Sequence, residues 1–448
     1  MKTICNPATP YEQLLGRQPI QPQVHHYRPM RFVIEQPVND GLLLYHTLTR
    51  QMLLLSTAET ASYRMHPDTL TPLIEAWFLV PKEHDDRLLS RQIKAVGRML
   101  EPQQTAITSY SILTTTDCNA RCFYCYERGR SRIPMTDDVA RHTASYIINH
   151  CGGQPVELLW FGGEPLYRKP VITLICRLLS DASIRFTSGM TSNAYLFDEE
   201  TVQEAVDLWK LRNIQITLDG TEDVYNRSKA YINSNGSPYR RVISNIHRLL
   251  QAGIGVRIRL NIDSHNADNL LLLVDELHRE FPNAKHMTVY PHPLFGESVK
   301  NAALYDDHKR VVMYQRIAEI QERIEAFGMA ERPRLEHHVK LHQCMADSDH
   351  AVVVLPTGHL GKCEHYTDSH FYGHIDSDEP DAAMLASFRE SRDEAEDCAT
   401  CAIYPDCFRL RKCEVATHCY PEMREWATRK IRRAMQVAYE EYLKEKEK

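Results

Sequence analysis

Between residues 106 and 330 the sequence alternates between short apolar runs and longer segments in which apolar residues recur at helical spacing. This alternation limits the possible folds more than any other feature, because repeated strand–helix units predict a parallel sheet. The six expected strand–helix pairs are Ser111–Thr115 with Asp137–His150, Val156–Trp160 with Val171–Leu179, Ile184–Met190 with Glu199–Lys210, Gln215–Leu218 with Val242–Ala252, Val256–Ile262 with Asp268–Glu280, and His286–Tyr290 with His308–Ala326. Six units predict an α/β fold with a partial (β/α)6 TIM-like barrel rather than the closed eight-strand form.

Polar or glycine-rich residues follow each expected strand. Ligands of α/β sheets bind at the carboxyl ends of the strands, so these residues are expected to share one rim. Glycine there allows close backbone approach, because it has no Cβ. After the second to sixth strands, the residues are Trp160-Phe161-Gly162-Gly163-Glu164-Pro165, Thr191-Ser192-Asn193, Asp219-Gly220, Asn261 and Pro291-His292-Pro293.

The loop after the first strand carries three cysteines, Cys118, Cys122 and Cys125, at C-x3-C-x2-C spacing. Three thiolates this close in sequence can hold three corners of a [4Fe–4S] cube, which ordinarily takes four protein thiolates. The next cysteine is Cys151, so one iron would keep an open position for chemistry. The alternative is a zinc knuckle that takes its fourth ligand from elsewhere in the chain.

Together these motifs resemble the radical S-adenosylmethionine (SAM) superfamily over residues 107 to about 330. The resemblance implies that Cys118, Cys122 and Cys125 hold a [4Fe–4S] cluster whose fourth iron is chelated by SAM. It also implies the positions of the SAM contacts. The methionine amino group would lie against Gly162, Gly163 and Glu164, the adenine near Tyr124, and the ribose and carboxylate near Ser192, Asn193, Thr217 and Lys229, with Arg227 or Arg259 as alternative carboxylate ligands.

Seven cysteines lie between Cys344 and Cys419, spaced C-x13-G-x4-C and then C-x2-C-x5-C-x5-C-x5-C. Two zinc ribbons would need eight ligands, and the candidates for the eighth are His338, His342, His365 and His418. The spacing also resembles the SPASM extension of peptide-modifying radical SAM enzymes, which carries two auxiliary [4Fe–4S] clusters. That resemblance implies one cluster on Cys398, Cys401, Cys407 and Cys419, and another on Cys344, Cys363 and Cys413.

The second of these clusters would be one ligand short. The family often has a further cysteine at the position of His338, and the spacing Cys407-x5-Cys413 is longer than the family's usual three. Either His338 or another residue completes the cluster, or one iron is open to substrate.

The expected domains are residues 1–105, 106–330, 331–425 and a C-terminal helix at 426–448. In the first domain, two short strands flank the turn Asn39-Asp40-Gly41 and helices follow, which predicts a small α+β module. A winged-helix-like module of this kind captures an extended leader peptide at a sheet edge. The alternative is a lid over the barrel. The domain at 331–425 would be the auxiliary-cluster domain.

The composition limits the classes of partner and the cellular compartment that this chain is expected to have. A net charge of −6 gives no sign of a nucleic-acid surface, and no run of 18 apolar residues suggests a membrane span. The first residues lack a secretory signal pattern, so the expected location is cytoplasmic. In a reducing compartment, the clustering among thirteen cysteines favours metal ligands over disulfides.

The favoured function is that of a peptide maturase, which uses a 5′-deoxyadenosyl radical to form a thioether or C–C cross-link in a ribosomally made peptide. The alternatives are a dehydrogenase like the anaerobic sulfatase maturases, with His292 or Asp263 as base, and a non-catalytic electron-transfer or zinc-ribbon protein. The expected partners are a precursor peptide or protein and an electron donor such as flavodoxin or ferredoxin. No residue is assigned as catalytic; Tyr126, Tyr290 and His292 are candidates by position only.

Overall fold

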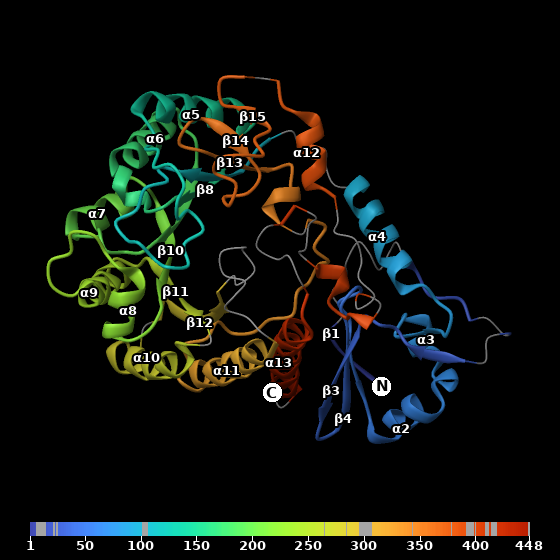
Figure 1. Ribbon diagram of the computed structural model, residues 1–448. Helices are drawn as coiled ribbons and strands as arrows, with labels where there is room; N and C mark the ends of the chain where they lie inside the picture. The colour runs from blue at the N-terminus through green and yellow to red at the C-terminus, as the bar shows by residue number, and fades with distance from the viewer. Residues whose placement is uncertain are drawn as a thin grey trace.

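The computed structural model (Figure 1) describes residues 1–5, 15–20, 23, 26–100, 106–263, 265–283, 285–294, 307–342, 344–377, 379–390, 398, 400–407, 412–413 and 419–446. A barrel-like β/α core stands beside the N-terminal module, and parts of the cysteine-rich C-terminal region lie between them. In this part of the chain, no helix is both long enough and apolar enough to cross a membrane.

The core is built on one sheet in the order β12-β11-β10-β9-β8-β7-β13-β14-β15. Its strands are β7 (Ser109–Leu113), β8 (Val156–Phe161), β9 (Phe186–Ser192), β10 (Leu211–Leu218), β11 (Gly255–Ile262), β12 (Met287–Pro293), β13 (Ala351–Val354), β14 (His359–Gly361) and β15 (Gly373–His374). The strands from β12 to β7 pair in parallel, which confirms the predicted α/β fold with a partial barrel. A seventh parallel strand, β13, comes from the cysteine-rich region and pairs with β7.

Helices cover the outer face of this sheet. They are α5 (Asp137–His150), α6 (Lys169–Asp181), α7 (Glu199–Asp207), α8 (Glu222–Lys229), α9 (Pro238–Gln251), α10 (Ala267–Glu280) and α11 (Asp307–Ala326). Thr136 caps α5 by accepting a hydrogen bond from the Val139 amide. Alternate residues of each strand pack against the helices: on β11, Ile258 and Leu260 join the hydrophobic core, whereas Arg259 and Asn261 line a cavity inside the sheet.

The N-terminal module has a four-stranded antiparallel sheet in the order β1-β5-β4-β3 and a separate pair of strands. Its elements are β1 (Lys2–Cys5), β2 (Tyr27–Pro29), β3 (Val33–Val38), β4 (Gly41–His46), β5 (Met52–Leu55), β6 (Leu79–Pro81), α2 (Thr57–Met65), α3 (Thr71–Glu75) and α4 (Asp86–Leu100). The C-terminal helix α13 (Pro421–Lys446) packs against β3 and α11 and so joins the module to the core (Figure 1). A short helix, α12 (Ala382–Phe388), belongs to the cysteine-rich region.

Candidate active site

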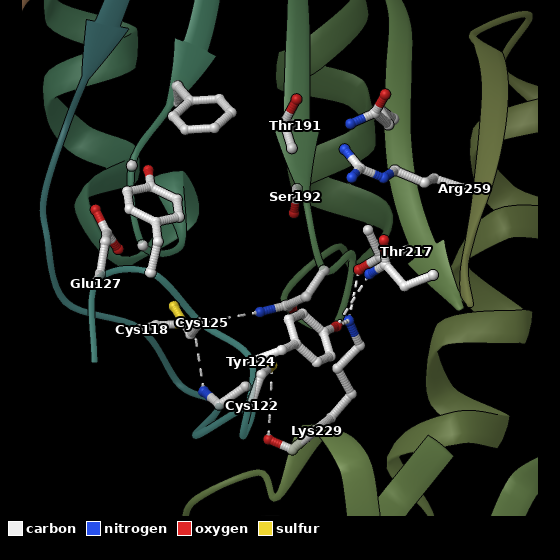
Figure 2. Close-up of a pocket in the computed structure, with 18 of the residues that line it drawn as sticks. Cys118, Cys122, Tyr124, Cys125, Glu127, Thr191, Ser192, Thr217, Lys229 and Arg259 are labelled. Atoms are coloured by element: carbon white, nitrogen blue, oxygen red, sulfur yellow. Dashed lines mark hydrogen bonds between the residues drawn. The ribbon is translucent and has the colours of Figure 1, made fainter. Parts of the chain in front are cut away.

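A cavity of about 270 Å³ opens at the carboxyl ends of the barrel strands (Figure 2). It brings together the three clustered cysteines and seven of the residues predicted on the rim, namely Phe161, Gly162, Gly163, Thr191, Ser192, Asn193 and Asn261. Its lining is Cys118, Ala120, Cys122, Tyr124, Cys125, Tyr126, Glu127, Phe161, Gly162, Gly163, Thr191, Ser192, Asn193, Gln215, Thr217, Lys229, Arg259, Asn261, Leu294 and His365. Arg227 is exposed and Glu164 is fully buried, and neither lines the cavity.

The cysteine loop is held against the end of β8 by backbone hydrogen bonds. The Gly163 amide donates to the Thr115 carbonyl at 3.0 Å, and the Glu164 amide donates to the Asp117 carbonyl at 2.9 Å. A Cβ on Gly162 would lie 2.2 Å from the Thr115 oxygen, and one on Gly163 would lie 2.3 Å from the Asp117 oxygen. The two glycines therefore serve the close approach of two backbones, which lets the loop sit directly beside the strand end.

Burial raises the pKa values of all three thiols in this loop, that of Cys125 to about 11. A bound iron cluster would offset this, because metal ligation favours the thiolate. Donors are already aimed at Cys118: the Ala120 amide lies 3.4 Å from its sulfur and Asn193 Nδ2 lies 3.8 Å from it. The loop thus has the donor set for a cluster held by three cysteines.

Glu164 links the ends of two strands. Its carboxylate accepts hydrogen bonds from Ser192 Oγ and the Asn193 amide at 2.8 Å each, and from the Leu166 amide at 3.2 Å. Burial raises its pKa to about 7 despite these donors. The side chain fixes Ser192 and Asn193, which themselves line the cavity.

The Tyr124 hydroxyl is the centre of a buried polar network (Figure 2). It donates to Asp219 at 2.7 Å and accepts from Lys229 Nζ at 2.7 Å and from Asn261 Nδ2 at 3.2 Å. Lys229 also donates to Thr217 Oγ1 at 2.5 Å and forms an ion pair with Asp219 at 3.1 Å. The predicted residues Tyr124, Thr217 and Lys229 therefore form one rigid wall, to which Asp219 supplies the balancing charge.

The cavity wall fits SAM. Two of its buried oxygens, Glu127 Oε1 and Asn261 Oδ1, have no hydrogen-bond partner among the residues described here. Buried acceptors of this kind require donors, and SAM carries donors in its amino group, ribose hydroxyls and adenine amine. Sequence reasoning missed Glu127; the only available signal was a charged residue two positions after Cys125.

The other candidates named from the sequence lie elsewhere on the rim. His292 Nδ1 lies 3.0 Å from Arg259 Nη2, and the Tyr290 hydroxyl donates to Gln215 at 2.5 Å. Asp263 accepts from the amides of His265 and Asn266 within a turn.

The cysteine-rich region forms two groups of thiols. Burial raises the pKa of the Cys363 thiol to about 12, and the charges of Cys344 and Cys413 act in the same direction. Burial likewise raises the pKa of the Cys401 thiol, with Cys407 and Cys419 as its charged neighbours. Cys363 and Cys413 also pack against the same small hydrophobic cluster, which Ala346, Tyr366 and Phe388 form.

The second group comprises Cys398, Cys401, Cys407 and Cys419, and within it the Cys401 amide donates to the Cys398 carbonyl at 3.4 Å. Among the residues that the structure describes, no three Cys, His, Asp or Glu side chains are arranged closely enough to hold a metal ion.

The histidines considered as further ligands are dispersed. His338 is exposed, and its carbonyl accepts from Arg50 at 3.1 Å. His342 Nδ1 lies 2.9 Å from the Asp347 carbonyl. His365 lines the barrel cavity. His418 lies outside the described residues.

The N-terminal module holds the second cysteine group in place. Arg31 Nη1 donates to the Cys398 carbonyl at 2.8 Å and Thr47 Oγ1 to the Ala402 carbonyl at 2.6 Å. Arg50 is 2% exposed and bonds both oxygens of Asp406, next to Cys407, at 2.6 and 2.7 Å. The sequence contains no local signal for these contacts.

Residues 112–287 match the family model of the radical SAM superfamily. The AdoMet-dependent heme synthase of Methanosarcina barkeri is 25% identical over 186 residues, which cover 40% of this chain and 48% of that protein. The GTP 3′,8-cyclase of Caulobacter vibrioides is 28% identical over 179 residues, which cover 39% of this chain and 49% of that protein. The chain thus spans about half the length of these curated relatives.

Two solved structures share the fold. The anSMEcpe structure with bound AdoMet superposes with a TM-score of 0.55 at 13% identity, over 75% of this chain and 98% of that one. The structure of Streptococcus suis SuiB bound to the precursor peptide SuiA superposes with a TM-score of 0.52 at 11% identity, over 87% of this chain and 100% of that one. Residues 112–287 therefore match the radical SAM superfamily, whose enzymes use a [4Fe–4S] cluster and SAM, and a cysteine-rich C-terminal region follows them in the chain.

Proposed function

We propose that this chain is a peptide-modifying enzyme that forms an intramolecular thioether or C–C cross-link in a ribosomally made peptide. One observation carries the proposal: residues next to both cysteine regions bound the same cavity. Tyr126, directly after Cys125, donates from its hydroxyl to the Glu364 carbonyl at 3.4 Å, and its ring centroid lies 4.4 Å from that of His365. A substrate in this cavity would lie between a SAM cluster and a second redox centre.

In this proposal the cysteines act as three sets of ligands: Cys118, Cys122 and Cys125 for the SAM cluster, Cys398, Cys401, Cys407 and Cys419 for one auxiliary cluster, and Cys344, Cys363 and Cys413 for the other. When bound, the first cluster and SAM supply a 5′-deoxyadenosyl radical that abstracts a hydrogen atom.

The chain's own residues position the reactants and exclude water. Gly162 and Gly163 contact the methionine amino group of SAM, and Ser192 and Asn193, which Glu164 orients, contact its ribose and carboxylate. Tyr124, Thr217 and Lys229 form the opposite wall, which the ion pair to Asp219 keeps rigid. Positioning of this kind is a major source of rate in enclosed sites.

The N-terminal module would capture the leader part of the precursor at an edge of its sheet, β1 or β3. Support comes from fold neighbours solved with peptides: SuiB with SuiA and anSMEcpe with Kp18Cys peptide, each sharing the fold with a TM-score above 0.5. An electron donor such as flavodoxin or ferredoxin completes the proposed set of partners.

The test is anaerobic incubation of the reconstituted full chain with SAM, reductant and the short peptides encoded beside its gene. We expect 5′-deoxyadenosine and a peptide that has lost two hydrogens, with a cross-link located by fragmentation. SAM cleavage without any change in peptide mass would contradict the proposal. Loss of two hydrogens with a new carbonyl and no cross-link would instead support the dehydrogenase.

A further inference from the structure

Glu127 is a buried acidic residue of the barrel cavity, and one of its carboxyl oxygens has no hydrogen-bond donor. The residue is 8% exposed, and its Oε1 has no partner among the residues that the structure describes. It lines the cavity at the end where Cys118 lies (Figure 2). Buried polar atoms without a partner are rare in folded proteins, and a bound ligand is one way to supply the missing donor.

The charged side chains that act on Glu127 do not supply this donor. Arg130 donates to Thr367 Oγ1 at 2.6 Å and forms an ion pair with Asp368 at 3.2 Å, so its guanidinium is directed toward the C-terminal region. Asp117 is itself acidic and adds a charge of the same sign. Burying a carboxyl group in such surroundings is unfavourable unless a donor from elsewhere reaches it.

The basic residues of the lining lie across the cavity from Glu127. Lys229 forms an ion pair with Asp219 at 3.1 Å and donates to the Tyr124 hydroxyl at 2.7 Å. Arg259 extends from β11 on the side opposite Glu127 (Figure 2). The donor that Glu127 requires is therefore expected from a molecule inside the cavity.

The position of Glu127 indicates which part of SAM it would meet. Its Oε2 lies 3.1 Å from the point that a Cβ on Gly163 would occupy. In the proposed function, the methionine amino group of SAM lies against Gly162 and Gly163. The N–H groups of this amino group are hydrogen-bond donors, and Glu127 offers an acceptor beside the same glycine.

The neighbouring acidic residue, Glu164, is engaged elsewhere. It is fully buried, and its carboxylate accepts from Ser192 Oγ and the Asn193 amide at 2.8 Å each and from the Leu166 amide at 3.2 Å. It does not line the cavity. Glu127, in contrast, is an acidic side chain that both lines the cavity and lies beside Gly163.

We propose that Glu127 binds the amino group of SAM by accepting a hydrogen bond from it, and so orients the amino-acid part of the cofactor. A hydrogen bond to a carboxylate is stronger than one between neutral groups. The inference rests on the binding of SAM in the proposed function and not on the identity of the modified peptide. A lysine side chain of the substrate is the competing source of the same donor.

The test compares two ligands that differ only in the amino group, namely S-adenosylhomocysteine and its desamino analogue. Both lack the sulfonium centre that is cleaved, so equilibrium dialysis on the reconstituted full chain measures binding without turnover. The variants are Glu127→Met, which removes the acceptor at similar length, and Glu127→Gln, which keeps a neutral acceptor. The control is Glu157→Met, because Glu157 is exposed on β8.

Wild type and Glu157→Met should bind S-adenosylhomocysteine more tightly than the desamino analogue. Glu127→Met should reduce this preference about ten-fold, and Glu127→Gln should keep part of it. An unchanged preference in Glu127→Met would overturn the inference, even if both ligands bound more weakly. Weaker binding of N-acetyl-lysine methylamide in Glu127→Met, with the preference intact, would also overturn it and assign Glu127 to the substrate.

Thermal unfolding without SAM separates binding from a structural role. Because Glu127 Oε1 has no partner in the described part of the chain, Glu127→Met should not lower the unfolding temperature. A clear decrease would mean that the carboxyl group stabilises the fold, and would overturn the inference.

This inference and the proposed function fail in different ways. If Glu127→Met loses the preference for the amino group but no peptide is ever modified, the peptide-modifying function fails and the role of Glu127 stands. If peptides are modified and the preference does not depend on Glu127, its role fails and the function stands.

Discussion

The two cysteine regions are built in different ways. The loop of Cys118 to Cys125 is fixed by the barrel itself, through backbone hydrogen bonds to Gly163 and Glu164 at the end of the next strand. The loop around Cys398 to Cys407 is fixed from more than 350 positions away in the sequence, by Arg31, Thr47 and Arg50 of the N-terminal module. The first site is therefore expected to form with the barrel alone, whereas the second depends on assembly of the whole chain.

The largest expected effect is the loss of SAM cleavage when a cysteine of the barrel loop is replaced. Cys118→Ser removes one of the three thiolates and should reduce SAM cleavage to background, because the cluster loses a ligand. Iron should fall by about four per chain while the remainder stays bound. The formation of 5′-deoxyadenosine measures SAM cleavage, and metal analysis measures the iron content. Loss of all iron would mean that the two regions do not form independently.

Arg50→Met tests whether the C-terminal cysteine region depends on its contacts with the N-terminal module. Breaking the buried ion pair with Asp406 leaves an uncompensated carboxylate and should cost about 3–5 kcal/mol. We expect loss of iron from the C-terminal region with retention of the barrel cluster, seen by iron analysis and electron paramagnetic resonance. The matched control is Arg17→Met, because Arg17 is 84% exposed in its ion pair with Glu75; it should change stability by less than about 1 kcal/mol. Equal loss from both regions would contradict the comparison.

A smaller effect is expected where the barrel loop meets β8. In Gly163→Ala the new methyl group would lie 2.3 Å from the Asp117 carbonyl, and the resulting shift should cost about 1–3 kcal/mol. Thermal unfolding and the rate of iron loss to a chelator measure this. Gly189→Ala is the control, since its Cβ would meet nothing closer than 3.6 Å. If the two variants behave alike, close backbone approach is not what requires Gly163.

The smallest effect concerns pH and the N-terminal module. Burial lowers the pKa of His46 from 6.5 to about 4, so the folded chain keeps it neutral while the unfolded chain takes up a proton below pH 6.5. The module should therefore lose stability as the pH falls from about 6.5 toward 4, by at most about 1.4 kcal/mol per pH unit.

Urea unfolding at pH 7 and pH 5 measures the effect of His46. His46→Asn should flatten the dependence on pH, because the amide oxygen can still accept from the Leu48 and Thr49 amides. An equally steep dependence in the variant would exclude His46 as its source.

The barrel was predictable because its signals are local. The apolar periods predicted the strands and helices, and the polar residues after the third strand predicted Ser192 and Asn193 at the rim. Tyr124 and Lys229 were predicted only from the resemblance to the radical SAM superfamily, and all four residues line one cavity. The sequence could not predict that the Glu164 side chain points toward the end of β9, because this orientation depends on the backbone amide that Asn193 presents there.

The C-terminal region was predictable only as a spacing of cysteines. That β13 extends the barrel sheet follows from tertiary packing, which no local pattern records. The same holds for Arg50, buried with a positive φ of 63° and paired with a residue 356 positions away.

Metal analysis of the anaerobically reconstituted full chain tests the central claim most directly, namely that both cysteine regions hold iron–sulfur clusters around one cavity. The account predicts about twelve irons with equal sulfide per chain, falling to about eight when Cys118, Cys122 and Cys125 are replaced by alanine. About four irons together with two zinc ions would contradict it, because the C-terminal cysteines would then form zinc ribbons instead of redox centres.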